Sequence, residues 1–146
     1  ERGGAGAIVG SVNGVPIVVE RTVFYATAEV DGTASEIGAS RPATQWLLGP
    51  ATSRPDADAA VLLNTSASEA RVSLTLLRTD GAARRPRELA DLRIPAGARL
   101  RVPLGELTGG RAYSVLVRSD APVVAERFSY SSGAGDVASL MGIPLD

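Results

Sequence analysis

Residues Pro16–Tyr25 read PIVVERTVFY, and residues Pro122–Tyr130 read PVVAERFSY. Each phrase is followed by a glycine-containing stretch and then by a second matching phrase, Ala34–Gly38 in the first copy and Ala138–Gly142 in the second. The first phrase recurs after 106 residues and the second after 104 residues. An echo at a nearly fixed period predicts a repeat architecture. We therefore expect one complete module, residues 41–146, preceded in residues 1–40 by the closing strands of a sister module.

Short alternating segments dominate the rest of the chain. Residues Arg71–Arg78 alternate between apolar and polar side chains, as a half-buried strand does. Residues Ala59–Asn64 form a continuous apolar run, which is typical of a strand covered on both faces. We expect about seven or eight such strands between Gln45 and Met141. The sequence therefore predicts an all-β fold, and specifically an immunoglobulin-like β-sandwich.

The N-terminal part of the chain is expected to add strands to this fold. Residues 5–12 read as a weak strand, and Asn13-Gly14 is a strong turn signal. Residues 15–30 read as one long strand. We expect a β-bulge in it, because the first copy of the repeated phrase has one more residue between Arg and Tyr than the second. These strands either pack on the same sheet or pair with another chain by strand addition.

Turn chemistry and proline divide the complete module. We expect turns at Asp80-Gly81, at Pro95–Gly97 and at Ser119–Pro122. Residues 84–92 are the best helical candidate, but Pro86 interrupts it.

The composition limits the chemistry that the chain can perform. Its 146 residues carry a formal net charge of −1, contain neither Cys nor His, and use Arg for all 15 basic positions. Without Cys there is no disulfide or thiolate metal site, and without His the side chain best suited to proton transfer near neutral pH is missing. The charge argues against binding nucleic acid, and the uncharged run of residues 3–19 is too short to span a membrane. We expect no enzymatic activity, no cofactor and no resident metal.

A series of motifs follows in a fixed order: WLLGP at 46–50, VLLNTS at 61–66, VSLTLL at 72–77, IPAGARLRVPL at 94–104 and SDAPVVAER at 119–127. This order resembles a family of uncharacterised tandem repeat domains in secreted and cell-surface bacterial proteins of GC-rich lineages. The resemblance covers residues 45–142, and its last third recurs at residues 15–38. The chain departs from the family's usual pattern at Thr65-Ser66 and after Trp46-Leu47. The resemblance implies an extracellular β-sandwich module and brings no catalytic residues.

The most distinctive polar feature of the sequence is a Glu-Arg dipeptide that occurs in both copies of the phrase, as Glu20-Arg21 and Glu126-Arg127. Adjacent strand residues face opposite ways, so the two side chains cannot form one site on one face. One of them lines a ligand surface, or both serve the fold. In the second case, which we favour, Glu pairs with a neighbouring-strand arginine such as Arg118 or accepts backbone hydrogen bonds.

Four aromatic residues are candidates for contact with a ligand or partner: Trp46, Tyr25, Tyr113 and Tyr130. Their rings could stack on a sugar, although a single Trp in a chain so poor in aromatics is more often a core residue. Asp56-Ala57-Asp58 offers oxygen atoms to Ca²⁺ but lacks the full ligand series of a calcium loop.

Three hypotheses for function follow. We expect a non-enzymatic structural or adhesive module of a secreted or cell-envelope protein, in the extracellular space or the envelope. The first alternative is a carbohydrate-binding module that contacts cell-wall glycan. The second is a subunit of a filament or larger complex, docked through its N-terminal strand.

Overall fold

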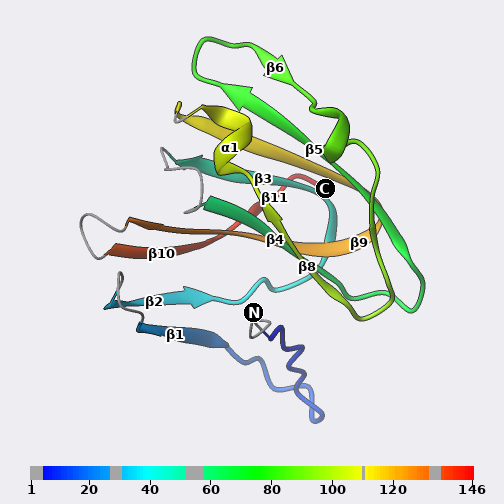
Figure 1. The fold of residues 1–146 in the computed structure, drawn as a ribbon. Helices are drawn as coiled ribbons and strands as arrows, with labels where there is room; N and C mark the ends of the chain where they lie inside the picture. The colour runs from blue at the N-terminus through cyan, green and yellow to red at the C-terminus, as the bar shows by residue number, and fades with distance from the viewer. Residues whose placement is uncertain (1–4, 27–30, 52–57, 110, 132–135) are drawn as a thin grey trace.

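A computed structural model describes residues 5–26, 31–51, 58–109, 111–131 and 136–146, and it consists mostly of antiparallel strands (Figure 1). In chain order the strands are β1 (Glu20–Ala26), β2 (Asp31–Ile37), β3 (Ala43–Ala51), β4 (Asp58–Asn64), β5 (Ala70–Arg78), β6 (Ala83–Arg84), β7 (Leu92–Ile94), β8 (Arg99–Pro103), β9 (Tyr113–Ser131), β10 (Asp136–Met141) and β11 (Ile143–Pro144). Two short helical turns, η1 (Arg87–Leu89) and α1 (Gly105–Thr108), lie between strands. The all-β prediction is confirmed, while the immunoglobulin-like arrangement stays a prediction. No helix in the described ranges has the length and hydrophobicity needed to cross a membrane.

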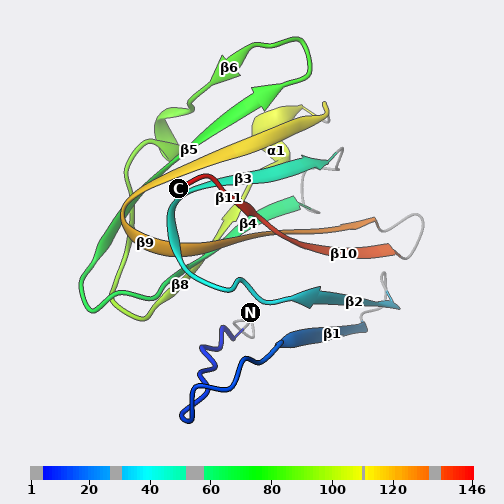
Figure 2. The ribbon, with the colours of Figure 1, turned by 180° about the vertical axis from the view of Figure 1, so that it is seen from behind.

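The 19-residue strand β9 organises the large sheet. Its first half lies between β3 and β5, with Val117 opposite both Trp46 and Leu74. Its second half lies between β10 and β4 and pairs antiparallel with both. Strand β8 adds to β4, β11 adds to β3, and β6 and β7 add to β5. One curved strand therefore joins both sets of neighbours into a single sheet (Figures 1 and 2).

Strand β9 runs without interruption through residues 119–122, where we expected a turn. The strand changes neighbours at this point, since Ser119 lies opposite Val72 of β5 and Val123 lies opposite Asn64 of β4. A proline has no backbone N–H to donate, and it is tolerated where a ladder is interrupted. The turn prediction at Ser119–Pro122 is therefore wrong, because these residues accompany a change of partners within one strand.

Aliphatic side chains from alternating positions fill the interior. In β5, Val72, Leu74 and Leu76 are buried, and the residues between them are only half-buried. In β4, all residues from Asp58 to Leu62 are buried, as predicted for a strand covered on both faces. Other core side chains are those of Trp46, Leu48, Leu89, Ile94, Val102, Leu104, Tyr113, Val115, Val117 and Val123. Full burial of each large aliphatic side chain contributes about 1.5–3 kcal/mol relative to exposure.

The two copies of the repeated sequence form the same hairpin. Strand β1 pairs with β2 so that Glu20 lies opposite Ile37, and β9 pairs with β10 so that Glu126 lies opposite Met141. These positions are equivalent in the two copies of the repeat. In Figures 1 and 2 the two hairpins point the same way, and β2 lies beside β10. The pair β1–β2 is a separate two-stranded sheet.

In each hairpin, the glycine that ends the second phrase donates a hydrogen bond across the two strands, at the end away from the loop. Gly142 N–H donates to the Ala125 carbonyl at 2.9 Å, and Gly38 N–H donates to the Val19 carbonyl at 2.8 Å. A Cβ on Gly142 would lie 2.8 Å from Leu48 Cδ2 and 2.9 Å from the Ala125 carbonyl oxygen. The close approach of strands at this point therefore requires glycine.

The N-terminal residues depart from three sequence-based expectations. The long strand predicted for residues 15–30 is wrong in its first part, because residues 15–19 are not in a strand and β1 begins at Glu20. Residues 5–12 contain no strand, although the Asn13 carboxamide accepts a hydrogen bond from Val15 N at 3.2 Å and the expected turn is present. The β1–β2 ladder shows no shift in register from Glu20 to Ala26, so the predicted β-bulge is wrong. The ladder accommodates the extra residue by growing longer.

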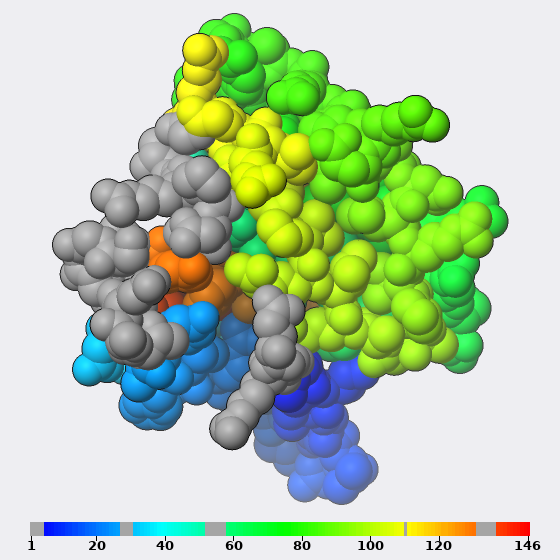
Figure 3. Space-filling view, viewed as in Figure 1, coloured from blue at the N-terminus to red at the C-terminus, as the bar shows by residue number. Residues whose placement is uncertain are grey.

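In the space-filling view, the segment before β1 stands out as a blue lobe at the lower edge (Figure 3).

Candidate functional site

The hairpin β1–β2 contacts β9 and β10 through the repeated Glu-Arg motif. Arg21 Nη2 donates to Glu126 Oε1 at 2.7 Å and to Ser139 Oγ at 3.2 Å. Ser139 Oγ also lies 3.4 Å from the same carboxylate oxygen, to which it donates. The side chain of Arg21 is 39% exposed and that of Glu126 is 9% exposed. The arginine of the first copy thus neutralises the glutamate of the second. The partner of Glu126 is an arginine, as one of the two expectations had it, but it is Arg21 and not the Arg118 given as an example.

A second guanidinium group interacts with Glu126 from strand β8. Burial lowers the pKa of Arg99, and the negative charge of Glu126 opposes this effect. The positive charges of Arg21 and Arg101 lower the pKa of Arg99 further. Glu126 therefore interacts with the positive charges of both Arg21 and Arg99.

Aromatic rings extend the same contact along β1 and β9. The Tyr25 ring centroid lies 5.8 Å from that of Phe128 and 6.0 Å from that of Tyr130, with which it is stacked at 23°. Tyr25 lies four positions after Arg21, so both face β9; Tyr130 lies three positions after Arg127, so those two face opposite ways. The extra residue in the first copy therefore places Tyr25 on the face of β1 that contacts β9.

The opposite face of β9 holds a buried ion pair. Arg127 Nε donates to Asp58 Oδ1 at 2.9 Å, and Arg127 Nη2 donates to Asp58 Oδ2 at 2.7 Å. Arg127 Nη1 donates to the carbonyls of Tyr113, at 2.9 Å, and Gly49. The arginine is 2% exposed and the aspartate 1%. A bidentate pair with its remaining donors satisfied is the arrangement that a buried charge needs.

Tyr113 completes this network. Its hydroxyl donates to Asp58 Oδ2, and the Arg127 guanidinium carbon lies 4.4 Å from the centre of its ring. Burial raises the pKa of Tyr113 well above its usual value, and the hydrogen bond to Asp58 raises it further. The phenol is therefore held as a neutral donor, which suits a structural role.

The four aromatic candidates divide into two pairs. Trp46 is 1% exposed, and its Nε1 donates to the carbonyls of Val123 at 2.9 Å and Ala43 at 3.2 Å. Tyr113 is buried as described, so neither ring is presented to a ligand at the surface. Tyr25 and Tyr130 are half-buried and contact each other. The alternative that Trp46 is a core residue agrees with its position.

The aspartate considered for calcium is engaged elsewhere. Both oxygens of Asp58 accept hydrogen bonds from Arg127, and Oδ2 also accepts one from Tyr113. Asp56 lies outside the described residues. No group of three or more metal-binding side chains occurs within the described ranges.

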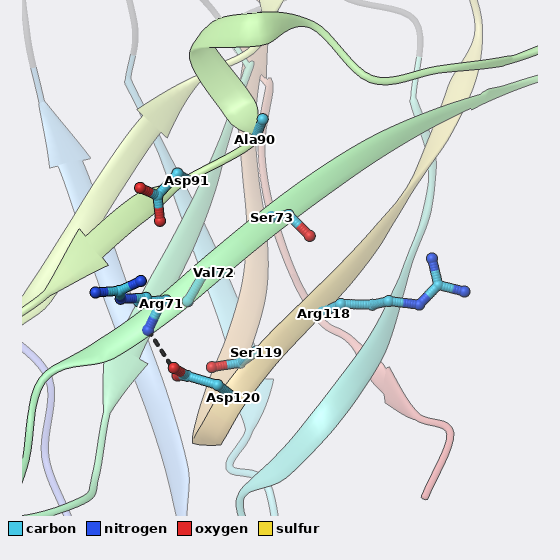
Figure 4. A pocket seen from close by; sticks show the side chains of 8 residues that line it. All are labelled: Arg71, Val72, Ser73, Ala90, Asp91, Arg118, Ser119 and Asp120. Atoms are coloured by element: carbon cyan, nitrogen blue, oxygen red, sulfur yellow. Dashed lines mark hydrogen bonds between the residues drawn. The ribbon is translucent and has the colours of Figure 1, made fainter.

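A shallow surface pocket of about 300 Å³ lies over the paired strands β5 and β9, next to Ala90 and Asp91 (Figure 4). Asp120 Oδ1 accepts a hydrogen bond from Arg71 N at 2.7 Å, and the Arg118 side chain points away from the others. Its lining residues are Arg71, Val72, Ser73, Ala90, Asp91, Arg118, Ser119 and Asp120. The pocket offers charges of both signs, and its two serines have no histidine or lysine in this sequence to activate them.

Sequence reasoning identified the repeated motif but missed its partners. Asp58 and Arg127 are 69 positions apart, and Arg21 and Glu126 are 105 positions apart. Ser139, the other acceptor for Arg21, also escaped notice, although it belongs to the second repeated phrase. Its counterpart in the first copy is Ser35, and this recurrence within the repeated phrase was the available signal.

Comparisons with known proteins concern the family and the fold. A family model described as "Family of unknown function (DUF5719)" matches residues 42–141. A crystal structure of Thermotoga maritima 1070 superposes with a TM-score of 0.60 at 17% identity, over 70% of this chain and 95% of that one. Anabaena sensory rhodopsin transducer superposes with a TM-score of 0.50 at 19% identity, over 57% of this chain and 94% of that one. No curated protein matches the chain.

Proposed function

Because the chain belongs to the family of unknown function DUF5719, we propose its role from its own geometry: a non-catalytic structural or adhesive module of a secreted or cell-envelope protein. The single observation that carries the proposal is the packing of one copy of the repeated hairpin on the other. Arg21 of the first copy binds Glu126 of the second at 2.7 Å. A motif whose two copies bind each other is best explained by assembly.

The placement of the charged residues supports a non-catalytic role. Arg127 and Asp58 neutralise each other in the interior, and Glu126 is engaged by Arg21. Proton transfer near neutral pH usually relies on His, and activated nucleophiles on His, Cys or Lys, all absent from this sequence.

The module is proposed to be an immunoglobulin-like sandwich over residues 41–146, with residues 1–40 as the closing strands of a preceding repeat. The different neighbours of the two halves of β9 and the aliphatic interior support the sandwich. The shared register of β1–β2 and β9–β10 supports the assignment of the first hairpin to a repeat.

Another protein chain is a better candidate partner than cell-wall glycan. Trp46 and Tyr113 are buried, so two of the four rings that could stack on a sugar are unavailable. The N-terminal part instead exposes Ile8, Val9, Val12, Val15, Ile17, Val18, Phe24 and Ile37. Exposed apolar side chains in this number favour a protein contact. A net charge of −1 gives no support for nucleic acid.

Two experiments test the proposal. Protease treatment of intact cells of the source organism should digest the protein, or the culture medium should contain it; retention inside intact cells would contradict the location. Panels of ester, phosphate and glycoside substrates should give no turnover above the blank. Turnover that disappears in Arg118→Ser or Asp91→Asn, two charged residues of the surface pocket, would overturn the non-catalytic assignment.

A further inference from the structure

Strand β1 and the second half of β9 occupy equivalent places in their hairpins. Arg21 lies opposite Glu36, and Arg127 lies opposite Leu140, at matching positions of the two copies. One hairpin is therefore a template for the surroundings of the other.

The template has a neighbour that β1 lacks. Strand β4 pairs antiparallel with β9, so that Asp58 lies opposite Ser129, Ala60 opposite Arg127 and Asn64 opposite Val123. Within the described residues, β1 pairs only with β2. Its second edge is therefore open at the place where β9 receives β4.

The residues leading into β1 show the same difference. Val123 is 0% exposed in the second copy, whereas its equivalent, Ile17, is 51% exposed in the first. Val18 is 83% exposed, while Val124, its equivalent, is half-buried beside β4. The first copy thus keeps the aliphatic sequence of a central strand without the neighbours that bury one.

The side chain of Arg21 points to the missing neighbour most directly. In the second copy, Arg127 Nε donates to Asp58 Oδ1 at 2.9 Å. In the first copy, Arg21 Nε is buried and has no hydrogen-bond partner in the structure. A buried donor without an acceptor has lost its hydrogen bonds to water and has gained none in return, which destabilises the structure. An aspartate in the place of Asp58 would remove this cost.

We propose that the open edge of β1, together with residues 17–19, accepts an extended strand with the chemistry of β4: an aspartate, two small residues, three aliphatic residues and an asparagine. The strand adds antiparallel to β1, with its aspartate opposite Val23 and its second small residue opposite Arg21, and a neighbouring repeat supplies it. Arg21 Nε then donates to the incoming carboxylate. This inference rests on the proposed assembly role and names the partner of the same hairpin.

The test uses the full chain and a peptide with the sequence DAAVLLN of residues 58–64, extended by lysines for solubility. Backbone NMR should show slowed hydrogen exchange at the β1 amides that point away from β2, and a shift of the Arg21 Nε–H resonance. Replacing the peptide's aspartate by asparagine should weaken binding about tenfold, because the amide oxygen still accepts a hydrogen bond but lacks the negative charge that strengthens it. Arg21→Gln in the protein should weaken it similarly, while Glu20→Gln, on the exposed face, should not.

Equal binding of the aspartate and asparagine peptides would overturn the proposal, as would protection confined to the edges of β8 or β10. If the free peptide does not bind, the same residues fused ahead of residue 1 through a flexible linker decide the matter. The fused aspartate form should have a higher Tm than the fused asparagine form, and equal Tm values would refute the inference. Such a failure would leave the non-catalytic role to its own cell-fraction and substrate tests.

Discussion

Arg21 Nη2 lies 2.7 Å from Glu126 Oε1, so the arginine of one copy of a repeated motif binds the glutamate of the other. The other residue of each Glu-Arg dipeptide has different surroundings. Glu20 is exposed, and Arg127 is buried against Asp58. The same dipeptide therefore serves two environments.

A double-mutant cycle on Arg21→Gln and Glu126→Gln should give a coupling energy of about 0.5–1 kcal/mol. The value is modest because Arg21 is 39% exposed, and solvent screens its charge. Urea unfolding at two salt concentrations measures it, and the coupling should fall at high salt. Glu20→Gln is the matched control and should change the free energy of unfolding by less than about 0.5 kcal/mol. Zero coupling at low salt would show that the hairpin docks without this ion pair.

Arg127→Met should lower the free energy of unfolding by about 3–5 kcal/mol, because it leaves the Asp58 carboxylate buried without its cation. Arg118→Met, on the same strand but exposed, should cost less than about 0.5 kcal/mol. Chemical denaturation of the two variants makes the comparison. Similar losses in both would mean that the buried pair has no special weight.

Stability should fall as the pH rises above about 10, the usual pKa of tyrosine. The pKa of Tyr113 is raised in the folded state, so above pH 10 the unfolded chain releases this proton while the folded chain keeps it. Its contribution is complete below the unfolded pKa and is lost as the pH approaches the folded one, with a slope of at most about 1.4 kcal/mol per pH unit. Between pH 9 and 11.5, the free energy of unfolding should fall less steeply with pH in Tyr113→Phe than in the unsubstituted protein. An identical pH dependence in both proteins would contradict the neutral, buried phenol.

Gly142→Ala should destabilise the fold by about 1–3 kcal/mol, because the new Cβ would overlap the Ala125 carbonyl oxygen and Leu48. Gly49→Ala is a suitable control, since nothing lies within 4 Å of its added Cβ. Thermal unfolding of both variants should show a loss of Tm only for Gly142→Ala. A loss of equal size in both would mean that the close strand approach does not determine the effect.

Local patterns in the sequence predicted the elements of the module well. Alternation in β5 and the apolar run of β4 follow directly from which faces are covered. The echo of the repeated phrase predicted two like structures, and β1–β2 and β9–β10 share one register. These features depend on neighbours along the chain or on the opposite strand of one hairpin.

Partners distant in the sequence were harder to predict. Asp58 stands in a run of turn-like residues, so its pairing with Arg127 left no local sign. At Ser119–Pro122, turn-forming residues accompany a change of strand neighbours, which sequence propensity does not distinguish from a reversal of the chain. The extra residue in the first copy suggested a β-bulge, but the β1–β2 ladder accommodates it by lengthening, without a shift in register.

Hairpin β1–β2 shares no ladder with the large sheet in the described part of the chain and is joined to β3 by residues 38–42. Lifting it away would break side-chain contacts but no strand-to-strand hydrogen bonds, so this opening has its own free energy, below that of global unfolding. The chain can therefore change what its first hairpin touches while its interior stays folded.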